Sequence, residues 1–197
     1  MGRAQSARHG ERRDSILDAA GRVFMRDGLQ GASISAICAE AGISPGHLYH
    51  YFNSKDEIVE AMAEGYLEYV REHFAKMAAC GSVVSAIDAE FQRAMERSNS
   101  GSHGLLFDMI AEAGRSEKVA ATLERNTRAI CQLLVELIRK GQRNGEIRAD
   151  LDPAIVATAI IGVIDAIKMV ARRDRKVDLR AVIAMIGAMI KRFIVAE

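Results

Sequence analysis

Apolar residues in the first quarter of the chain recur at three- and four-residue intervals, which is the spacing of an amphipathic helix. One such stripe predicts a first helix from about residue 11 to residue 27, which Gly28 ends. Its members are Ile16, Leu17, Ala20, Val23 and Phe24. We expect the next helices to pack against this apolar face.

The next stretch, residues 33–55, reads SISAICAEAGISPGHLYHYFNSK and carries the signals for two short helices around a sharp turn. Ser33 can cap the first helix, and Gly42 can supply the left-handed residue that ends it. Ser44 followed by Pro45 is a start signal for the second helix. Together with the preceding helix, the pair predicts a small module of the helix-turn-helix type.

The second helix of this pair, over residues 45–52, has an unusual outward face. Leu48 and Phe52 are four residues apart and are expected to face the core. The outward residues are then Gly46, His47, His50 and Tyr51. Imidazole and phenol groups suit contacts with base edges and phosphates, although a merely exposed helix face would also accommodate them.

The string GISPGHLYHYFNSKDEI, at residues 42–58, resembles the recognition-helix signature of the TetR family of bacterial transcriptional regulators. The motif match covers roughly residues 11–60. Beyond it, the all-helical layout and the length resemble the family, and residues 104–152 are loosely similar to the regulatory domains of its BetI-like members. Tyr51 stands where many members have His, and Cys38 where many have Ala.

The resemblance implies DNA contacts from this module. The tyrosine that matches Tyr49 offers its hydroxyl to the DNA backbone in the family while its ring packs; a purely core role is the alternative. Lys55 and Ser44 are predicted to bind phosphates, and Ser33 can do likewise, although capping alone would explain it. The predicted DNA-binding residues are Ser33, Ser44, Pro45, Gly46, His47, Tyr49, His50, Tyr51 and Lys55.

A fourth helix begins near Ser54 and continues toward Met77, which makes it too long to belong to the small module alone. Turn-rich breaks separate the helices that follow, and Asp152 with Pro153 marks the start of one of them. Their predicted ranges are 83–97, 105–113, 116–144, 153–171 and 179–195. The predicted domains are a flexible basic arm at 1–10, a helix-turn-helix DNA-binding domain at 11–55, and a helical effector-binding and dimerisation domain at 56–197.

The arm carries Arg3 and Arg8 among small and polar residues, without the apolar segment of a signal peptide. A solvated tail and a basic arm that touches DNA phosphates both explain these charges.

The last two predicted helices are apolar on every side over much of their length. Residues 154–164 and 181–190 carry no charge, and neither run reaches the roughly 20 residues needed to cross a bilayer. A domain of this size cannot easily bury two such helices, so a second subunit is expected to cover them. In the family, the corresponding helices form a four-helix dimer interface. The residues predicted for it are Ile160, Ile164, Val182, Ile186, Met189 and Ile190.

The helices over about 54–140 carry many Met and aromatic side chains, which suit an adaptable pocket, and the resemblance implies an effector site among them. Candidate lining residues are Met62, Tyr66, Phe91, Met95, Phe107 and Met109. Ordinary core packing is the alternative for each of them. The expected effector is an apolar or amphipathic small molecule.

Composition narrows the class. The 197 residues include only two prolines, which favours a helical protein, and a net charge of +1 confines any nucleic-acid contact to a local patch. Cys38, Cys80 and Cys131 lack paired spacing, which favours free thiols in a reducing cytoplasm. The five histidines form no metal-ligand motif, so neither a metal nor a cofactor is expected.

Two patterns point elsewhere. Tyr51 and Lys55 form a Tyr-x-x-x-Lys pair that resembles the catalytic pair of short-chain dehydrogenases, but no strand leads into a glycine-rich fingerprint upstream. No catalytic residue is therefore predicted. The basic run over 172–176 is interrupted by Asp174, so a solvated loop is favoured over a second nucleic-acid patch.

These patterns predict an all-α, two-domain, homodimeric transcription regulator in the cytoplasm, held at the nucleoid by operator binding. The resemblance implies ligand-responsive repression. A near-palindromic DNA operator is expected, because a two-fold dimer would place its recognition helices about one DNA turn apart. A small helical enzyme or ligand carrier is the alternative class. Salt-sensitive, specific binding to duplex DNA separates the two.

Overall fold

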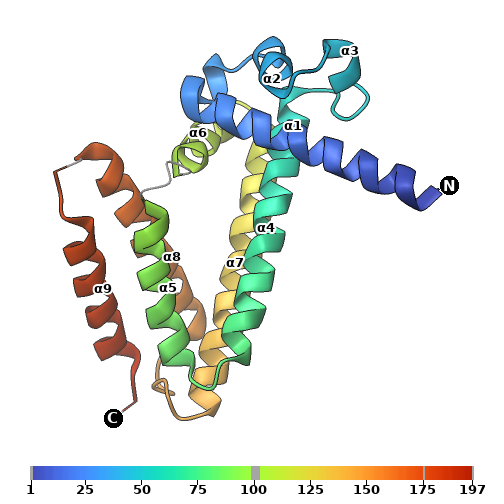
Figure 1. Ribbon diagram of the computed structural model, residues 1–197. Helices are drawn as coiled ribbons and strands as arrows, with labels where there is room; N and C mark the ends of the chain where they lie inside the picture. Colours follow the sequence, from blue (N-terminus) through green and yellow to red (C-terminus); the bar gives the residue numbers. More distant parts are fainter. Residues whose placement is uncertain (1, 99–102, 175, 197) are drawn as a thin grey trace. The chain divides into compact units, whose positions relative to one another are not determined.

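The computed structural model describes residues 2–98, 103–174 and 176–196, and within these ranges the secondary structure is helical (Figure 1). Within these ranges, the one β-type feature is an antiparallel bridge between Ile147 and Val195. The all-α prediction is confirmed. The helices are α1 (Gly2–Gly31), α2 (Ile34–Ala41), α3 (Pro45–Leu48), α4 (Lys55–Ala79), α5 (Val83–Ser98), α6 (His103–Ala113), α7 (Glu117–Arg143), α8 (Pro153–Arg173) and α9 (Leu179–Ile194).

The start of α1 differs in secondary structure from the predicted arm, because residues 2–10 are helical. Proline is absent from this segment, and its alanines, glutamine and arginines are good helix formers. Gly28 interrupts α1 as predicted, with φ 72° and ψ 165°. That backbone conformation is essentially restricted to glycine. One further helical turn then follows to Gly31.

The predicted caps of α2 are present. The Ser33 hydroxyl accepts a hydrogen bond from the Ala36 N–H at 3.1 Å, and Gly42 ends the helix in the left-handed conformation with φ 63°. The N–H of Ile43 donates to the carbonyl of Cys38 at 3.0 Å. These bonds satisfy backbone groups that both ends of a helix leave open.

The second helix of the pair is shorter than predicted, because α3 ends at Leu48 and residues 49–51 form turns. The Tyr51 N–H donates to the Leu48 carbonyl at 2.8 Å, which is a three-residue rather than a four-residue hydrogen bond. The chain therefore tightens where residues 49–51 were expected to continue the helix.

The chain folds into two compact units: unit 1 comprises residues 1–66 and 104–126, and unit 2 comprises residues 67–103 and 127–197. This division differs from the predicted boundary at residue 55. The core of unit 1 includes Met109 of α6 and Val119 of α7 besides residues of α1–α4. The helix-turn-helix module therefore shares its core with segments far along the chain.

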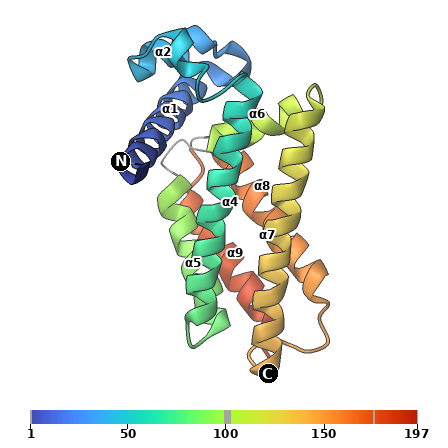
Figure 2. The same cartoon turned by 90° about the vertical axis from the view of Figure 1, so that its right-hand side faces the viewer.

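Polar contacts join the helices of unit 1 to one another. The Leu29 N–H, just after the Gly28 kink, donates to Asp108 Oδ2 of α6 at 3.2 Å. In both views α4 runs beside α7 (Figures 1 and 2), and the Asn126 side-chain amide donates to the Ala63 carbonyl at 2.7 Å. The side chains of α6 and α7 thus hold backbone groups of α1 and α4.

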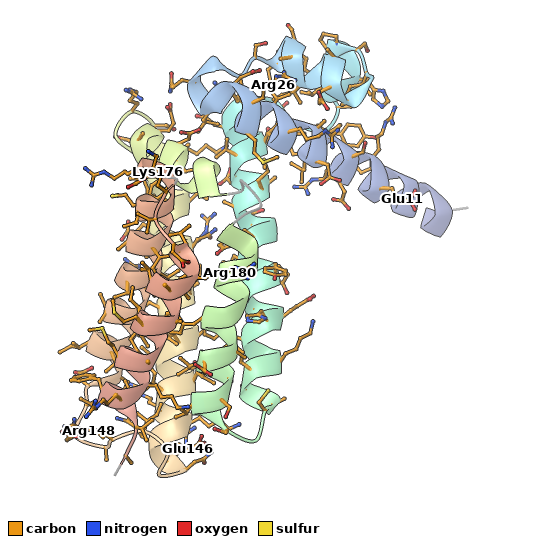
Figure 3. The ribbon with its side chains drawn as sticks, turned by 60° about the vertical axis from the view of Figure 1, so that its left-hand side comes forward. Glu11, Arg26, Glu146, Arg148, Lys176 and Arg180 are labelled. Carbon is orange, nitrogen blue, oxygen red and sulfur yellow. The ribbon has the colours of Figure 1, made fainter. Side chains whose placement is uncertain are left out.

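Unit 2 has its own core, in which α9 packs against α5 and α8. At Gly187 of α9, an added Cβ would lie 3.7 Å from the Phe91 side chain, so α5 and α9 approach closely there. Glu146 and Arg148 lie at the same end of this unit, in the α7–α8 loop (Figure 3). Among the described residues, no helix is both long enough and apolar enough to span a membrane.

Candidate nucleic-acid interface

Local capping and two apolar anchors position the face of α3. The Ser44 hydroxyl accepts a hydrogen bond from the His47 N–H at 3.2 Å, which starts the helix. Leu48 and Phe52 are fully buried in the core of unit 1. Because these anchors fix the rotation of the segment, Pro45, Gly46, His47 and His50 are exposed, as predicted for a binding face.

Tyr49 lies on the same exposed surface. Its side chain is 51% exposed, which is incompatible with a purely core role. About half of the residue's surface is thus accessible, which is compatible with the dual role.

Tyr51 is only half-buried and belongs to an aromatic cluster. Its ring stacks on His9 of α1, with centroids 4.6 Å apart and planes at 24°. His47 lies 5.7 Å from Tyr51 and 6.4 Å from His50, centroid to centroid. The cluster therefore combines three predicted contact residues with one, His9, that was not a predicted site residue.

His9 could have been found by extending the helical pattern of α1. It precedes Arg13 by four residues and the core residue Ile16 by seven, so all three fall on one face. The expectation of a flexible arm over 1–10 concealed this relationship.

Lys55 and Ser33 have structural partners in addition to any DNA contact. The Lys55 ammonium donates to the carbonyls of Leu29, at 2.8 Å, and Ala32, at 3.2 Å. It therefore satisfies backbone acceptors near the end of α1 from the start of α4. The Ser33 hydroxyl is occupied as a cap of α2. Phosphate contacts by these two residues stay predictions.

The turn that follows the exposed face is held by Glu57. This carboxylate accepts hydrogen bonds from the Asn53 backbone N–H at 2.6 Å and from the Asn53 side-chain amide at 3.1 Å, and Ser54 caps the Glu57 N–H. The backbone hydrogen bond from Asn53 is the main cause that lowers the pKa of Glu57. The link from the helix-turn-helix into α4 is thus stabilised by the ionised carboxylate.

Surface ion pairs connect α1 to α2. Glu40 lies 2.6 Å from Arg22 and 3.5 Å from Arg26, and the hydrogen bond from Arg22 is the main cause that lowers the pKa of Glu40. Because both arginines are exposed, the pairs add little to stability.

The candidate pocket residues are distributed over both units. Met62 and Phe107 are half-buried, Met109 is buried and Tyr66 is 54% exposed, all in unit 1. Phe91 is buried in the core of unit 2, and the side chain of Met95 lies outside the described residues. A shared pocket stays a prediction.

One small cavity within unit 2 is lined by Phe91. Its volume of about 10 Å³ has room for a single water at most. The lining also includes Val84, Ile87, Asp88, Gly187, Lys191 and Ile194. This cavity is too small for an effector of the expected kind.

The residues predicted for the dimer interface differ in how much surface they expose. Met189 is 62% exposed, whereas Ile164, Val182, Ile186 and Ile190 are half-buried. Ile160 is 5% exposed and belongs to the core of unit 2, so it has little surface left for a second subunit.

Two neighbours of Met189 on α9 were missed. Met185 and Phe193 are 59% and 57% exposed, and with Met189 they are spaced every fourth residue. The uncharged run over 181–190 contains Met185, so the sequence already held part of this signal. The three side chains form the α9 stripe.

Within the described residues, no group of three or more His, Cys, Asp or Glu side chains is arranged to hold a metal ion. Lys55, the second member of the Tyr-x-x-x-Lys pair, donates instead to two backbone carbonyls.

A capped helix-turn-helix with an exposed histidine- and tyrosine-rich face defines the class as a DNA-binding transcriptional regulator. Residues 16–62 match the sequence model described as bacterial regulatory proteins, tetR family, and residues 82–185 match the one described as tetracyclin repressor-like, C-terminal domain. The chain therefore belongs to the TetR family. This membership indicates a regulator rather than an enzyme.

Relatives and a solved structure agree with this assignment. The HTH-type transcriptional regulator UidR of Escherichia coli K12 is 31% identical over 153 residues, which are 76% of each chain. The HTH-type transcriptional repressor KstR2 of Rhodococcus jostii RHA1 is 27% identical over 145 residues, covering 72% of this chain and 70% of KstR2. The structure of Salmonella enterica GusR superposes with a TM-score of 0.77 at 25% identity, covering 92% of this chain and 96% of GusR.

Proposed function

We propose that this regulator is a repressor that binds a near-palindromic operator as a homodimer and responds to an apolar or amphipathic small molecule. The exposed face formed by Pro45, Gly46, His47, Tyr49 and His50 is the observation that carries the DNA-binding part. The name of the relative KstR2 as a repressor supports the direction of regulation.

The DNA contacts would be of two kinds. Ser44 and Lys55 would contact phosphates, together with the Ser33 hydroxyl and the exposed Tyr49 hydroxyl. His47, His50 and Tyr51 would contact base edges. Replacing a phosphate contact should weaken binding to all sequences and lower the salt slope by about one, whereas replacing a base contact should chiefly reduce discrimination, by about 1–3 kcal/mol.

Dimerisation would use the exposed apolar side chains of α8 and α9. The α9 stripe of Met185, Met189 and Phe193 is supported by Ile155 of α8, which is 70% exposed. Large apolar side chains grouped on neighbouring helices are typical of an interaction surface. A two-fold interface would then present two recognition surfaces to the two halves of an operator.

The effector is the least constrained partner. Met62, Tyr66, Phe91, Met95, Phe107 and Met109 remain its candidate contacts. Asn126 of α7 adds a polar feature, because its buried Oδ1 has no hydrogen-bond partner among the described residues. A buried acceptor without a partner is costly, so a ligand that donates a hydrogen bond would be favoured over a purely apolar one.

Footprinting of the protein on DNA that flanks its own gene tests the operator proposal. We expect protection of one short, near-palindromic segment that survives competition by unrelated DNA at physiological salt. Uniform, salt-sensitive protection without a preferred segment would contradict specific recognition.

Effector response is tested separately. Candidate apolar and amphipathic compounds are screened by thermal shift, and those that stabilise the protein are then added to the operator complex. We expect release of DNA without chemical change of the compound, to the extent that the ligand prefers one state of the protein. A compound that stabilises the protein at saturation and leaves operator affinity unchanged would show a site without a switch.

A further inference from the structure

We propose that His9 is a positioning residue for DNA sequence recognition, in which its imidazole holds the Tyr51 ring in the orientation that reads the operator. This inference rests on the proposed function, because it assigns to the predicted reading surface a residue from outside the helix-turn-helix motif. His9 is expected to act through Tyr51 and not as a phosphate contact.

The geometry of the two rings supports a stabilising contact. Their centroids are 4.6 Å apart and their planes differ by 24°, which is within the range of stacked aromatic pairs. His9 is exposed, so burial in a core does not force it against Tyr51. The stack is therefore a specific surface contact between α1 and the segment after α3.

Neighbouring turns of α1 place His9 in register with Tyr51. Four residues further along α1, the Arg13 guanidinium lies 5.2 Å from the centroid of the Phe52 ring. Ile16, three residues beyond Arg13, is fully buried in the core. Two successive turns of α1 thus contact two adjacent residues: Arg13 lies over Phe52, and His9, one turn closer to the N-terminus, stacks on Tyr51.

The consequence for recognition follows from how bases are read. A side chain discriminates between bases by directional hydrogen bonds, and these require its polar atoms to be held in place. Tyr51 lies in a turn after α3, and its half-buried side chain packs against the core of unit 1 on one side. His9 stacks on its ring, and His47 lies 5.7 Å away, so these neighbours limit its rotation.

Operator binding by four variants tests the proposal: His9→Ala, His9→Phe, Tyr51→Ala and the double variant His9→Ala/Tyr51→Ala. Affinities are measured for the operator, for operators changed at single base pairs and for unrelated DNA, over a range of salt concentrations. Loss of the stack should reduce discrimination by about two- to tenfold at the base pairs that Tyr51→Ala also affects. His9→Phe keeps a flat ring and should restore most of it.

The double variant separates positioning from an independent contact. If His9 acts through Tyr51, the double variant discriminates no worse than Tyr51→Ala alone. His73→Ala is the matched control, because it removes the stack between Tyr69 and His73 in unit 2, where the rings lie 6.3 Å apart at 8°. It should leave discrimination unchanged.

A DNA-independent measurement keeps the inference distinct from the proposed function. In the free protein, Tyr51→Ala should shift the NMR signals of the His9 ring protons, because the ring current of the phenol is lost. An unchanged His9 signal overturns the inference whatever the DNA results. His9→Ala also overturns it if discrimination is unchanged, or if binding to all sequences falls equally with a smaller salt slope. Absence of any preferred operator for the unaltered protein overturns the proposed function, and the inference with it.

Discussion

At the residue scale, Lys55 combines a structural role with a predicted phosphate contact. Its ammonium serves as hydrogen-bond donor to the carbonyls of Leu29 and Ala32, so it links the start of α4 to the residues at the end of α1. Both bonds are charge-assisted, which makes them stronger than neutral ones. Removing the ammonium is therefore expected to affect folding as well as the proposed phosphate contact.

We expect Lys55→Met to lower the free energy of unfolding by about 1–3 kcal/mol, because it leaves two partly buried carbonyls without their donor while keeping an apolar stem. Urea denaturation at pH 7 measures this change. Lys118→Met is a suitable control, since its ammonium pairs at 3.0 Å with Glu60 on an exposed surface and should contribute little. Equal stability of the Lys55 variant and the unaltered protein would contradict the structural role.

Glu57 gives a pH-dependent prediction at the same scale. Its pKa is lowered in the folded protein, first by the Asn53 backbone hydrogen bond, so its contribution to stability is present above the unfolded-state pKa of about 4.3. The contribution is lost as the pH falls through the lower folded-state pKa. Glu57→Gln should therefore be less stable than the unaltered protein at pH 7, by a modest amount because the site is exposed.

Denaturation midpoints of the unaltered protein and of Glu57→Gln, measured between pH 7 and pH 3, check the predicted direction of this stability difference. The difference between the two proteins should shrink as the pH falls below the unfolded-state pKa and the carboxylate of the unaltered protein begins to bind protons. A difference that stays constant over this range would show that hydrogen bonding by the neutral group, and not the charge, holds the turn.

At the element scale, the kink in α1 is one of the features that join the helix-turn-helix module to α6, beside the hydrogen bond from the Gln30 amide to Glu112. Gly28 adopts φ 72° and ψ 165°, and the next N–H along the chain donates to Asp108. An added Cβ at Gly28 would lie 3.6 Å from Asp108 Oδ2, which is an ordinary contact distance. Backbone strain, and not crowding, therefore decides which residue this position accepts.

Gly28→Ala should destabilise the protein by about 1–3 kcal/mol, because alanine rarely adopts this conformation. Gly65→Ala is the matched control: Gly65 lies within α4, and an added Cβ there meets no atom within 4 Å. That variant should be more stable by about 0.5–1 kcal/mol, since alanine is the better helix former. Thermal or urea unfolding of both variants tests whether the two changes in the free energy of unfolding have opposite signs. A Gly28→Ala protein as stable as its parent would show that Gly28 is not needed for this backbone conformation.

At the scale of the whole molecule, the proposed dimer depends on surface that a single chain leaves exposed. The side chains of the α9 stripe meet this condition, whereas Ile160 does not. A charge at Ile160 would enter the core of unit 2 and test folding rather than association. The exposed methionines are therefore the informative positions.

Met189→Lys should convert a dimer into a folded monomer. In the monomer the lysine would stay in water, whereas in the proposed dimer interface its charge would lose its hydration. Sedimentation velocity and circular dichroism measure association and folding, respectively. Met25→Lys is the control, since Met25 of α1 is 53% exposed and lies outside the proposed interface. A dimer that persists with charges at both Met185 and Met189 would exclude the α9 stripe as the interface.

Local signals in the sequence were sufficient wherever a helix begins or ends through its own neighbours. Ser33, Gly42, Ser44 with Pro45, and Asp152 with Pro153 are found at the predicted caps. A cap depends on hydrogen bonds over three or four residues and on φ, both of which a short window of sequence determines. The exposure of Gly46, His47 and His50 followed equally well, since two apolar anchors in one turn fix the rotation of the segment, whereas Tyr51 is half-buried.

The sequence by itself thus determined the order of the helices, the caps named above, the exposure of His47 and His50, and the TetR-like pattern around them. Only the tertiary structure decided that α1 extends to meet Tyr51 through His9, that Lys55 donates to the end of α1, and that Ile160 is buried in its own unit. These outcomes join residues 23 or more positions apart or depend on which helices share a core, as α6 and α7 do with the helix-turn-helix module. Helical periodicity gives the side of a helix on which a residue lies, but the partner on that side is set by packing between distant segments.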